Sequence, residues 1–157
     1  MKRLVIKVGS AVLREDTTLA INRLNNLVDF IAKLKEEKNL QVILVSSGAV
    51  AAGNTKLNLD RKKILNRQAL AAIGQPLLMK YYKKRFAQHD IKCAQMLLVA
   101  EDFDSRKRSE NAKAVMEILL ENDIVPIINE NDVIANEELL FGDNDQLGAH
   151  AAYFFDA

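Results

Sequence analysis

Four short apolar runs rich in β-branched residues recur along the chain and predict strands buried on both faces of a sheet. They cover residues 4–8, 41–45, 92–99 and 124–128. Between them, apolar side chains repeat at helical spacing, with charged side chains on the opposite face. This pattern predicts helices over residues 22–38, 62–73, 76–89, about 106–122 and 146–154.

Strands that alternate with helices are typical of an α/β fold with a parallel sheet, right-handed crossovers and helices on both faces. The 157 residues suffice for one domain with its own core. Two local patterns predict where helices begin and end. Gly74 and Gln75, followed by Pro76, separate two helices, and the pair Asp104 and Ser105 can cap the next helix.

Two polar clusters in the last third of the chain indicate a binding site. Residues 129–132 directly follow the strand at 124–128, and residues 142–145 directly precede the helix at 146–154. In open α/β sheets, ligands bind outside the carboxyl ends of strands, and converging carboxylates and amides are costly to bury unless something binds them. Ordinary turn and capping chemistry remains an alternative. A calcium-binding loop is excluded, because Ile134 stands where its glycine belongs.

The strand at residues 4–8 contains Lys7, which stands just before a turn made by Gly9 and Ser10. A lysine in an apolar strand often extends into solvent at a sheet edge. At the carboxyl end of a strand, beside such a turn, it can instead meet a ligand. We favour this functional interpretation.

The second strand leads into a run of small residues that includes Gly48 and Gly53. Backbone N–H groups can approach an anion there without a Cβ in the way, and the dipole of a following helix adds to the attraction. The glycine spacing is that of a Walker A loop, but Asn54 and Thr55 stand where Lys and Ser or Thr are required. The segment therefore predicts an anion-binding turn that is not a P-loop, and no dinucleotide fingerprint occurs in the sequence.

Composition and charge narrow the possible functions. The hydrophobic fraction is 49% and the charged fraction is 27%, as in an ordinary globular protein. The net charge of +1 argues against a protein specialised for nucleic acid or membrane surfaces. We therefore interpret the basic face at Lys80, Lys83, Lys84 and Arg85 as a solvated face beside a packing surface, where the apolar part can serve a subunit contact.

Cys93 is the only cysteine, so a disulfide framework is excluded and a reducing, cytoplasmic setting is expected. It lies in an apolar run, which predicts a buried, inert thiol. The sequence has neither the apolar region of a signal peptide nor a run of about 18 apolar residues that could span a membrane. Residues 153–157 lack a glycine stop or a polar tail, and we expect more chain to follow.

Five motifs can be compared with known families: IKVGS at 6–10, VSSGAVAAG at 45–53, ALAAIGQ at 69–75, PIINEND at 126–132 and FGDNDQLGA at 141–149. In order and spacing they closely resemble the glutamate 5-kinases, a branch of the amino acid kinase family. The resemblance covers the whole chain. Its specific part is SSGA-x-AAG together with INEND and GDND, which separates this branch from aspartate, carbamate and UMP kinases.

The resemblance implies ATP-dependent phosphorylation of the γ-carboxylate of L-glutamate to γ-glutamyl phosphate, the first step of proline biosynthesis, with Mg²⁺. It also implies a three-layer αβα sandwich around a mainly parallel sheet. Feedback inhibition by L-proline and a homo-oligomer are further expectations. Neither nucleic acid nor a membrane is an expected partner.

The resemblance also assigns roles to residues, motif by motif. Lys7 is expected to lie against the transferring phosphoryl group, with Asp145 orienting it. Glutamate is expected to bind Ser47, Asp132 and Asn144. The phosphoryl path is expected to be lined by Lys7 and by the backbone of Gly9, Ser10 and Gly48. No residue is assigned as a metal ligand. These roles suit phosphoryl transfer, which depends mainly on positioning and charge neutralisation.

The resemblance finally implies that residues 1–157 are the N-terminal, glutamate-binding portion of one kinase domain. The family's adenine and ribose pocket, second phosphate-binding lysine and glycine-rich nucleotide loop have no counterpart in this sequence. Catalysis by this stretch alone is therefore not expected. Two alternatives stay open: a non-catalytic amino-acid-binding or regulatory module, and a family member with another phosphate acceptor.

Overall fold

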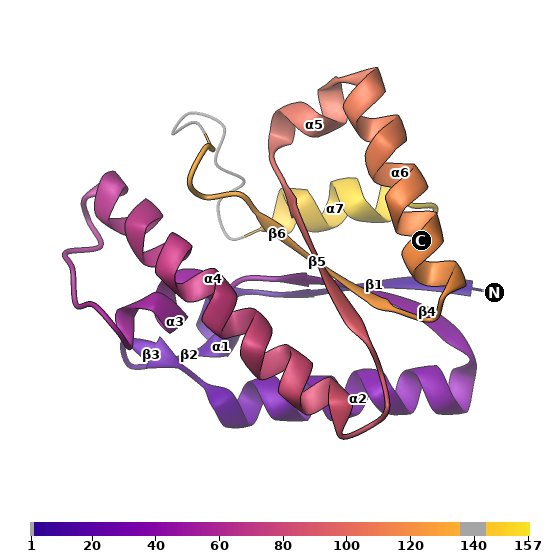
Figure 1. The fold of residues 1–157 in the computed structure, drawn as a ribbon, viewed down its shortest axis with the longest axis horizontal. Coiled ribbons are helices and arrows are strands. Elements are labelled where there is room, and N and C mark those ends of the chain that lie inside the picture. The colour runs from indigo at the N-terminus through magenta and orange to yellow at the C-terminus, as the bar shows by residue number, and fades with distance from the viewer. Residues whose placement is uncertain (1, 136–143) are drawn as a thin grey trace.

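A computed structural model describes residues 2–135 and 144–157. Within these ranges the central sheet contains β1 (Lys2–Val8), β4 (Leu40–Ser46), β6 (Val125–Glu130) and β5 (Cys93–Leu98), in that spatial order. Neighbouring strands are parallel throughout, so their carboxyl ends open at one edge of the sheet (Figure 1). The parallel sheet predicted from the sequence is confirmed.

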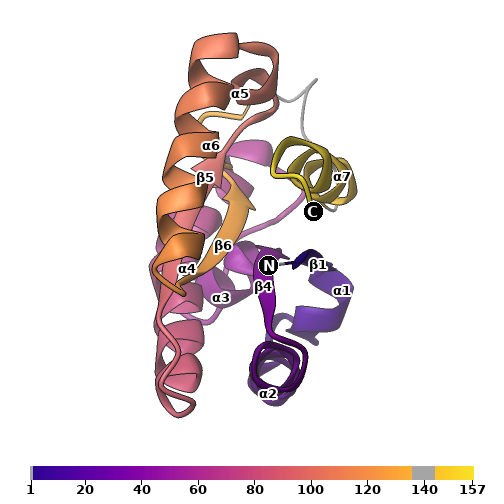
Figure 2. The same cartoon turned by 90° about the vertical axis from the view of Figure 1, so that its right-hand side faces the viewer.

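Helices cover both faces of the sheet (Figure 1, Figure 2). One face carries α1 (Ser10–Leu13), α2 (Ile21–Lys38), α3 (Ala49–Asn54) and α4 (Ile64–Ala87), and the other carries α5 (Ala100–Asp104), α6 (Arg106–Glu121) and α7 (Asp145–Phe154). An antiparallel hairpin of β2 (Arg14–Glu15) and β3 (Thr18–Leu19) follows α1. This arrangement confirms the expected αβα sandwich.

Alternate side chains of the central strands enter two separate apolar cores. In β4, Val42 and Leu44 pack with α2 and α4, whereas Ile43 and Val45 pack with α6 and α7. All four are at most 1% exposed. Successive strand residues point to opposite faces, and each fully buried side chain of this kind contributes about 1.5–3 kcal/mol. The middle of a strand covered on both faces is therefore apolar at successive positions, as at residues 42–45.

The predicted break before Pro76 is wrong, because Ile64–Ala87 form one continuous helix, α4. A proline inside a helix removes one backbone hydrogen bond and crowds the preceding turn. Tertiary packing offsets this cost. The side chains of Tyr82 and Phe86, on the turns that follow, are fully buried in the core between α4 and the sheet.

Gly74 does not end the helix; it is a point at which α4 touches α3. A Cβ on Gly74 would lie 1.7 Å from the carbonyl oxygen of Ala49, and a Cβ on Gly53 would lie 1.9 Å from that of Leu70. No Cβ fits at such distances, so the two helix backbones are in direct contact at both glycines. Gly53, whose spacing suggested a phosphate loop, is a packing residue.

The basic face of α4 adjoins a packing surface, as the sequence suggested. Arg85 binds Asp29 of α2 with an Nη2–Oδ2 distance of 2.5 Å, and His89 Nε2 lies 2.8 Å from Oδ1 of the same carboxylate. Hydrogen bonds from Arg85 and then His89 lower the pKa of Asp29 to about 2. This face therefore ties α4 to α2.

Two local predictions need correction. Ser105 is the N-cap of α6, but its side chain makes no capping hydrogen bond. Cys93 is half-buried rather than buried, because it stands at the start of the edge strand β5. Burial still raises the pKa of its thiol, as in an unreactive cysteine. In the ranges that the structure describes, no helix is both long and apolar enough to cross a membrane.

We predict that Gly74→Ala lowers the free energy of unfolding by at least the roughly 1–3 kcal/mol typical of overpacking. The added methyl group would meet a backbone oxygen, which cannot rotate away as a side chain can. Urea denaturation followed by circular dichroism measures the change. The matched control is Gly148→Ala in α7, where the new Cβ would lie 3.4 Å from Lys7 Cβ, an ordinary contact. Equal stability of the two variants would contradict the close approach of α3 and α4.

Candidate functional site

A cavity of about 660 Å³ opens at the carboxyl ends of β1, β4 and β6. Its lining is drawn from separate parts of the chain: Ser10, Arg14, residues 47–51, residues 60–62, Arg67, Asn129, Glu130, Asp132 and Asn144. Carboxylate, guanidinium and amide groups face one space. This mixture favours a ligand that itself carries charges of both signs.

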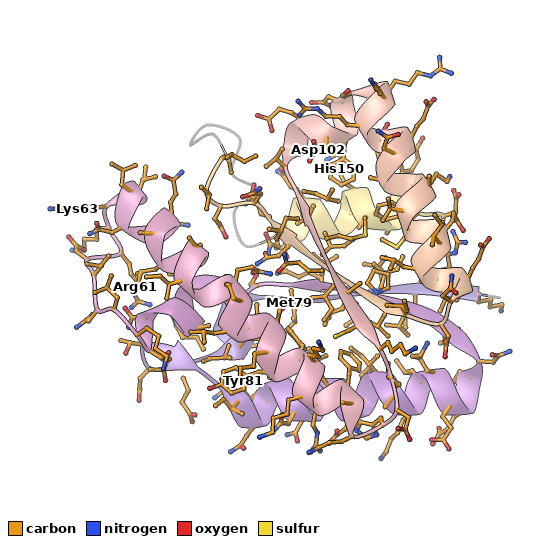
Figure 3. The ribbon with its side chains drawn as sticks, in the orientation of Figure 1. Arg61, Lys63, Met79, Tyr81, Asp102 and His150 are labelled. Atoms are coloured by element: carbon orange, nitrogen blue, oxygen red, sulfur yellow. The ribbon has the colours of Figure 1, made fainter. Side chains whose placement is uncertain are left out.

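The loop between α3 and α4 supplies basic residues to the lining. Arg61 lies in this loop near α3, whereas Lys63, at the start of α4, extends outward (Figure 3). Asn66 Nδ2 donates to the carbonyl oxygen of Asp60 (2.9 Å), which holds the loop against the first turn of α4. Arg67 follows on that turn and also lines the cavity.

Asn144 and Ser47, two of the predicted glutamate-binding residues, are in direct contact. Asn144 is the N-cap of α7 and adopts a left-handed conformation with φ of 59°, which asparagine tolerates better than most residues. Its Nδ2 donates to Ser47 Oγ at 3.0 Å and to Asn129 Oδ1 at 2.9 Å. All three side chains are buried, so these bonds fix the amide of Asn144.

Asp132, the third predicted glutamate-binding residue, lines the same cavity just after β6. Partial burial raises the pKa of its carboxyl above the ordinary value, and the nearby guanidinium of Arg67 partly offsets that rise. A carboxylate held in a partly dry cavity is poorly solvated. It therefore gains from a cationic ligand group.

Lys7 and Asp145 form an ion pair beside the cavity, with Lys7 Nζ 2.5 Å from Asp145 Oδ1. Although β1 is an edge strand, the Lys7 side chain is only 23% exposed, because α7 lies over its stem at Gly148. Neither residue belongs to the cavity lining itself. They adjoin it because Asp145 directly follows Asn144 in the chain.

The residues expected to line a phosphoryl path meet at the ends of β1 and β4. Ser10 and Gly48 line the cavity, whereas Gly9, the N-cap of α1, does not belong to its lining. The Ser47 N–H donates to the Val8 carbonyl (3.0 Å) and thereby joins the two turns. Gly48 has a φ of 111°, a conformation that is strained for any residue with a side chain.

Several residues that line the cavity were not given a role from the sequence. Glu130 is 6% exposed and lines the cavity, and its place in the polar cluster at 129–132 was a usable signal. Arg67 gave no such signal, because its position depends on where α4 begins and how α4 packs against α3. Residues 142 and 143 of the second polar cluster lie outside the described residues.

The sheet, its covering helices and the polar cavity at its carboxyl edge define the class of protein. The profile of the amino acid kinase family matches residues 2–157, and the chain belongs to this family. The family resemblance noted in the sequence is thereby confirmed.

Relatives that match this chain carry the name of one branch of the family, glutamate 5-kinase. The chain is 56% identical to a glutamate 5-kinase of Wolinella succinogenes over 161 residues, covering 100% of this chain and 61% of that protein. It is 52% identical to a glutamate 5-kinase of Leishmania donovani, covering 100% of this chain and 59% of that protein. For a glutamate 5-kinase of Thermus thermophilus the identity is 49%, with coverage of 99% and 42%. The chain spans about half the length of these curated relatives.

We predict that Asp132→Asn raises the melting temperature at neutral pH. The pKa of Asp132 is raised on folding, so the folded protein holds this proton more tightly than the unfolded chain does. The ionised carboxylate therefore costs stability above the folded pKa, and this cost disappears as pH falls through that pKa toward 3.8. Thermal unfolding at pH 7 and at mildly acidic pH measures the difference. Asp16→Asn, in an exposed turn, is the control. A lower melting temperature of Asp132→Asn at pH 7 would contradict the prediction.

Proposed function

We propose that the protein containing these residues acts as a glutamate 5-kinase. It transfers the γ-phosphoryl group of ATP to the γ-carboxylate of L-glutamate and yields γ-glutamyl phosphate, the first step of proline biosynthesis. The observation that carries the proposal is the contact of Asn144 with Ser47 beside the Lys7–Asp145 ion pair, at the carboxyl edge of the sheet. The names of the relatives support the same reaction.

The charges of the cavity suit L-glutamate, which carries one ammonium group and two carboxylates. We assign the α-ammonium group to Asp132, whose partly buried carboxylate gains from a cation. Ser47 and Asn144 supply hydrogen bonds to the same end of the molecule. Arg14 and Arg67, which also line the cavity, offset the negative charge of a carboxylate.

The chemical step needs an aligned acceptor and neutralised charge rather than covalent catalysis. Lys7 places an ammonium group at the end of β1, where it offsets charge on the equatorial phosphoryl oxygens. Asp145 holds that ammonium group in position. The backbone of Ser10 and Gly48, which line the cavity, and of Gly9, which directly precedes Ser10, borders the path between the acceptor and the phosphoryl donor. Removing one such preorganised group costs about 3–4 kcal/mol of barrier in comparable sites.

Residues 1–157 are, in this proposal, the glutamate-binding portion of one kinase domain, and the adenine-binding half lies elsewhere in the protein. The length of the relatives supports this division. Over the described residues, no group of three or more His, Cys, Asp or Glu side chains is placed to hold a metal ion. In kinases, water and the phosphate oxygens of the substrate supply most of the ligands of Mg²⁺, together with one or two carboxylates.

The family resemblance supports two further proposals. L-proline acts as a feedback inhibitor by competing with glutamate for the cavity, and the protein is a homo-oligomer. The reading as a non-catalytic amino-acid-binding module is less favoured, because relatives at up to 56% identity carry the name of the enzyme.

The direct test is a hydroxamate assay on the protein expressed from its complete coding sequence, with ATP, Mg²⁺ and L-glutamate. Hydroxylamine traps γ-glutamyl phosphate as a coloured hydroxamate, so a glutamate-dependent signal is expected. Aspartate, acetylglutamate and carbamate serve as alternative acceptors. Turnover with one of these acceptors and none with glutamate would move the protein to another branch of the family. Binding of glutamate without any turnover would favour the non-catalytic module.

We predict that Lys7→Ala lowers kcat by about a hundredfold or more while the protein stays folded. Lys113→Ala is the control. It removes another lysine that pairs with a carboxylate, Asp156 (2.6 Å), but on an exposed surface away from the cavity. Steady-state kinetics and melting temperatures of both variants provide the measurement. Near-normal turnover of Lys7→Ala would remove Lys7 from the mechanism.

A further inference from the structure

A chain of side-chain amides connects α4 to the candidate glutamate site. Asn129 Nδ2 donates to Gln75 Oε1 at 2.9 Å, and Asn144 Nδ2 donates to Asn129 Oδ1 at 2.9 Å. Asn144 in turn donates to Ser47 at 3.0 Å. The three amides therefore connect α4 on one face of the sheet, through the end of β6, to the N-terminus of α7 on the other face.

The orientation of the Asn129 amide is fixed by the backbone of β6. The Glu130 N–H donates to Asn129 Oδ1 at 2.9 Å, so the oxygen of the Asn129 amide must face this N–H. The nitrogen of the same amide then points to Gln75. Asn129 is 3% exposed, and a buried amide that loses one of these partners keeps an unsatisfied group.

The fixed amide of Asn129 also fixes that of Asn144. Oδ1 of Asn129 accepts a hydrogen bond, so Asn144 must direct its Nδ2 toward it. The second hydrogen of that Nδ2 goes to Ser47 Oγ. The same Nδ2 also lies 3.4 Å from the carbonyl oxygen of Ser46. Because both amide hydrogens point to acceptors, Oδ1 of Asn144 is the polar atom that, among the contacts of the described residues, is left to meet a ligand in the cavity. Asn144 thus presents an acceptor, which matches a ligand donor such as an ammonium group.

We propose that Gln75 is a positioning residue for the amino-acid substrate. Gln75 does not belong to the cavity lining, yet through Asn129 it holds Asn144 with its oxygen toward the α-ammonium group. The inference rests on the proposed function, because it assigns the ammonium group of L-glutamate to this oxygen. It adds a specificity determinant that lies outside the substrate-binding residues.

A purely structural role for Gln75 makes a different prediction. Gln75 Nε2 also donates to Gln95 Oε1 of β5 at 2.9 Å, so the side chain could merely join α4 to the sheet. In that case its loss would weaken the binding of every ligand to the same extent. In a positioning role, its loss affects ligands with an ammonium group and spares those without one.

The experiment compares three variants of the protein expressed from its complete coding sequence. Gln75→Met keeps the length of the side chain but removes both hydrogen-bonding groups. Gln75→Glu retains an oxygen that accepts from Asn129. Gln95→Met removes the outer partner of Gln75, at an exposed position, and leaves the bond from Asn129 to Gln75 in place.

Two ligands separate the roles: L-glutamate as substrate and glutarate, which lacks only the α-ammonium group, as competitive inhibitor. We expect Gln75→Met to raise KM for L-glutamate about tenfold, the order of effect of one lost hydrogen bond at a buried group. The inhibition constant of glutarate and KM for ATP stay unchanged. Gln75→Glu and Gln95→Met keep the wild-type KM for L-glutamate. Wild-type behaviour of Gln75→Met, or an equal loss for glutarate and glutamate, would overturn the proposal.

A second measurement separates this inference from the proposed function. If the wild-type protein does not phosphorylate glutamate, the proposed function fails, but the amide chain can still be tested without substrate. In ¹⁵N-labelled protein, solvent exchange of the Asn144 side-chain amide hydrogens should be slow in the wild type and Gln95→Met, and faster in Gln75→Met. Equally slow exchange in all three proteins would show that Gln75 does not hold Asn144.

Discussion

The arrangement of the cavity depends on the direct backbone contact between α3 and α4. Because Gly53 and Gly74 carry no Cβ, the backbones of α3 and α4 can approach each other as closely as they do at this contact. This close approach brings the first turn of α4, with Arg67, to the mouth of the cavity, and a later turn, with Gln75, to the end of β6. Two glycines outside the cavity thus determine which polar side chains reach it.

The strands and the ligand-binding edge could be predicted from sequence because both depend on local patterns. A strand buried on both faces is mainly apolar, as in residues 42–45 of β4, and a polar residue at its end then stands out. The polar cluster at residues 129–132 was found in this way, whereas Ser47 and Asn144 were named through the family motifs; the latter two side chains touch. The continuous helix α4 was not found, since a glycine before a proline is locally typical of a helix end. Its packing partner Ala49 lies 25 residues earlier in the chain, beyond the reach of any local pattern.

The sequence also left open which atoms of the polar residues face a ligand. It placed Asn144 before a helix, but the orientation of its amide depends on Asn129, and through it on Gln75. These three residues belong to different elements, on both faces of the sheet and at its edge. Hydrogen-bond direction is therefore a property of the assembled fold. A motif can name the residue without determining whether it offers a donor or an acceptor.

The chemistry of Asn129 follows from its partners in the same way. Its oxygen accepts from the Glu130 N–H and from Asn144, while its nitrogen donates to Gln75. An aspartate of the same length could accept both bonds but could not donate the third. A leucine could form none of the three. Only an amide on a short side chain meets all three requirements in a position that is 3% exposed. Asn129 is thus required because its side chain joins α4 on one face of the sheet to the start of α7 on the other face.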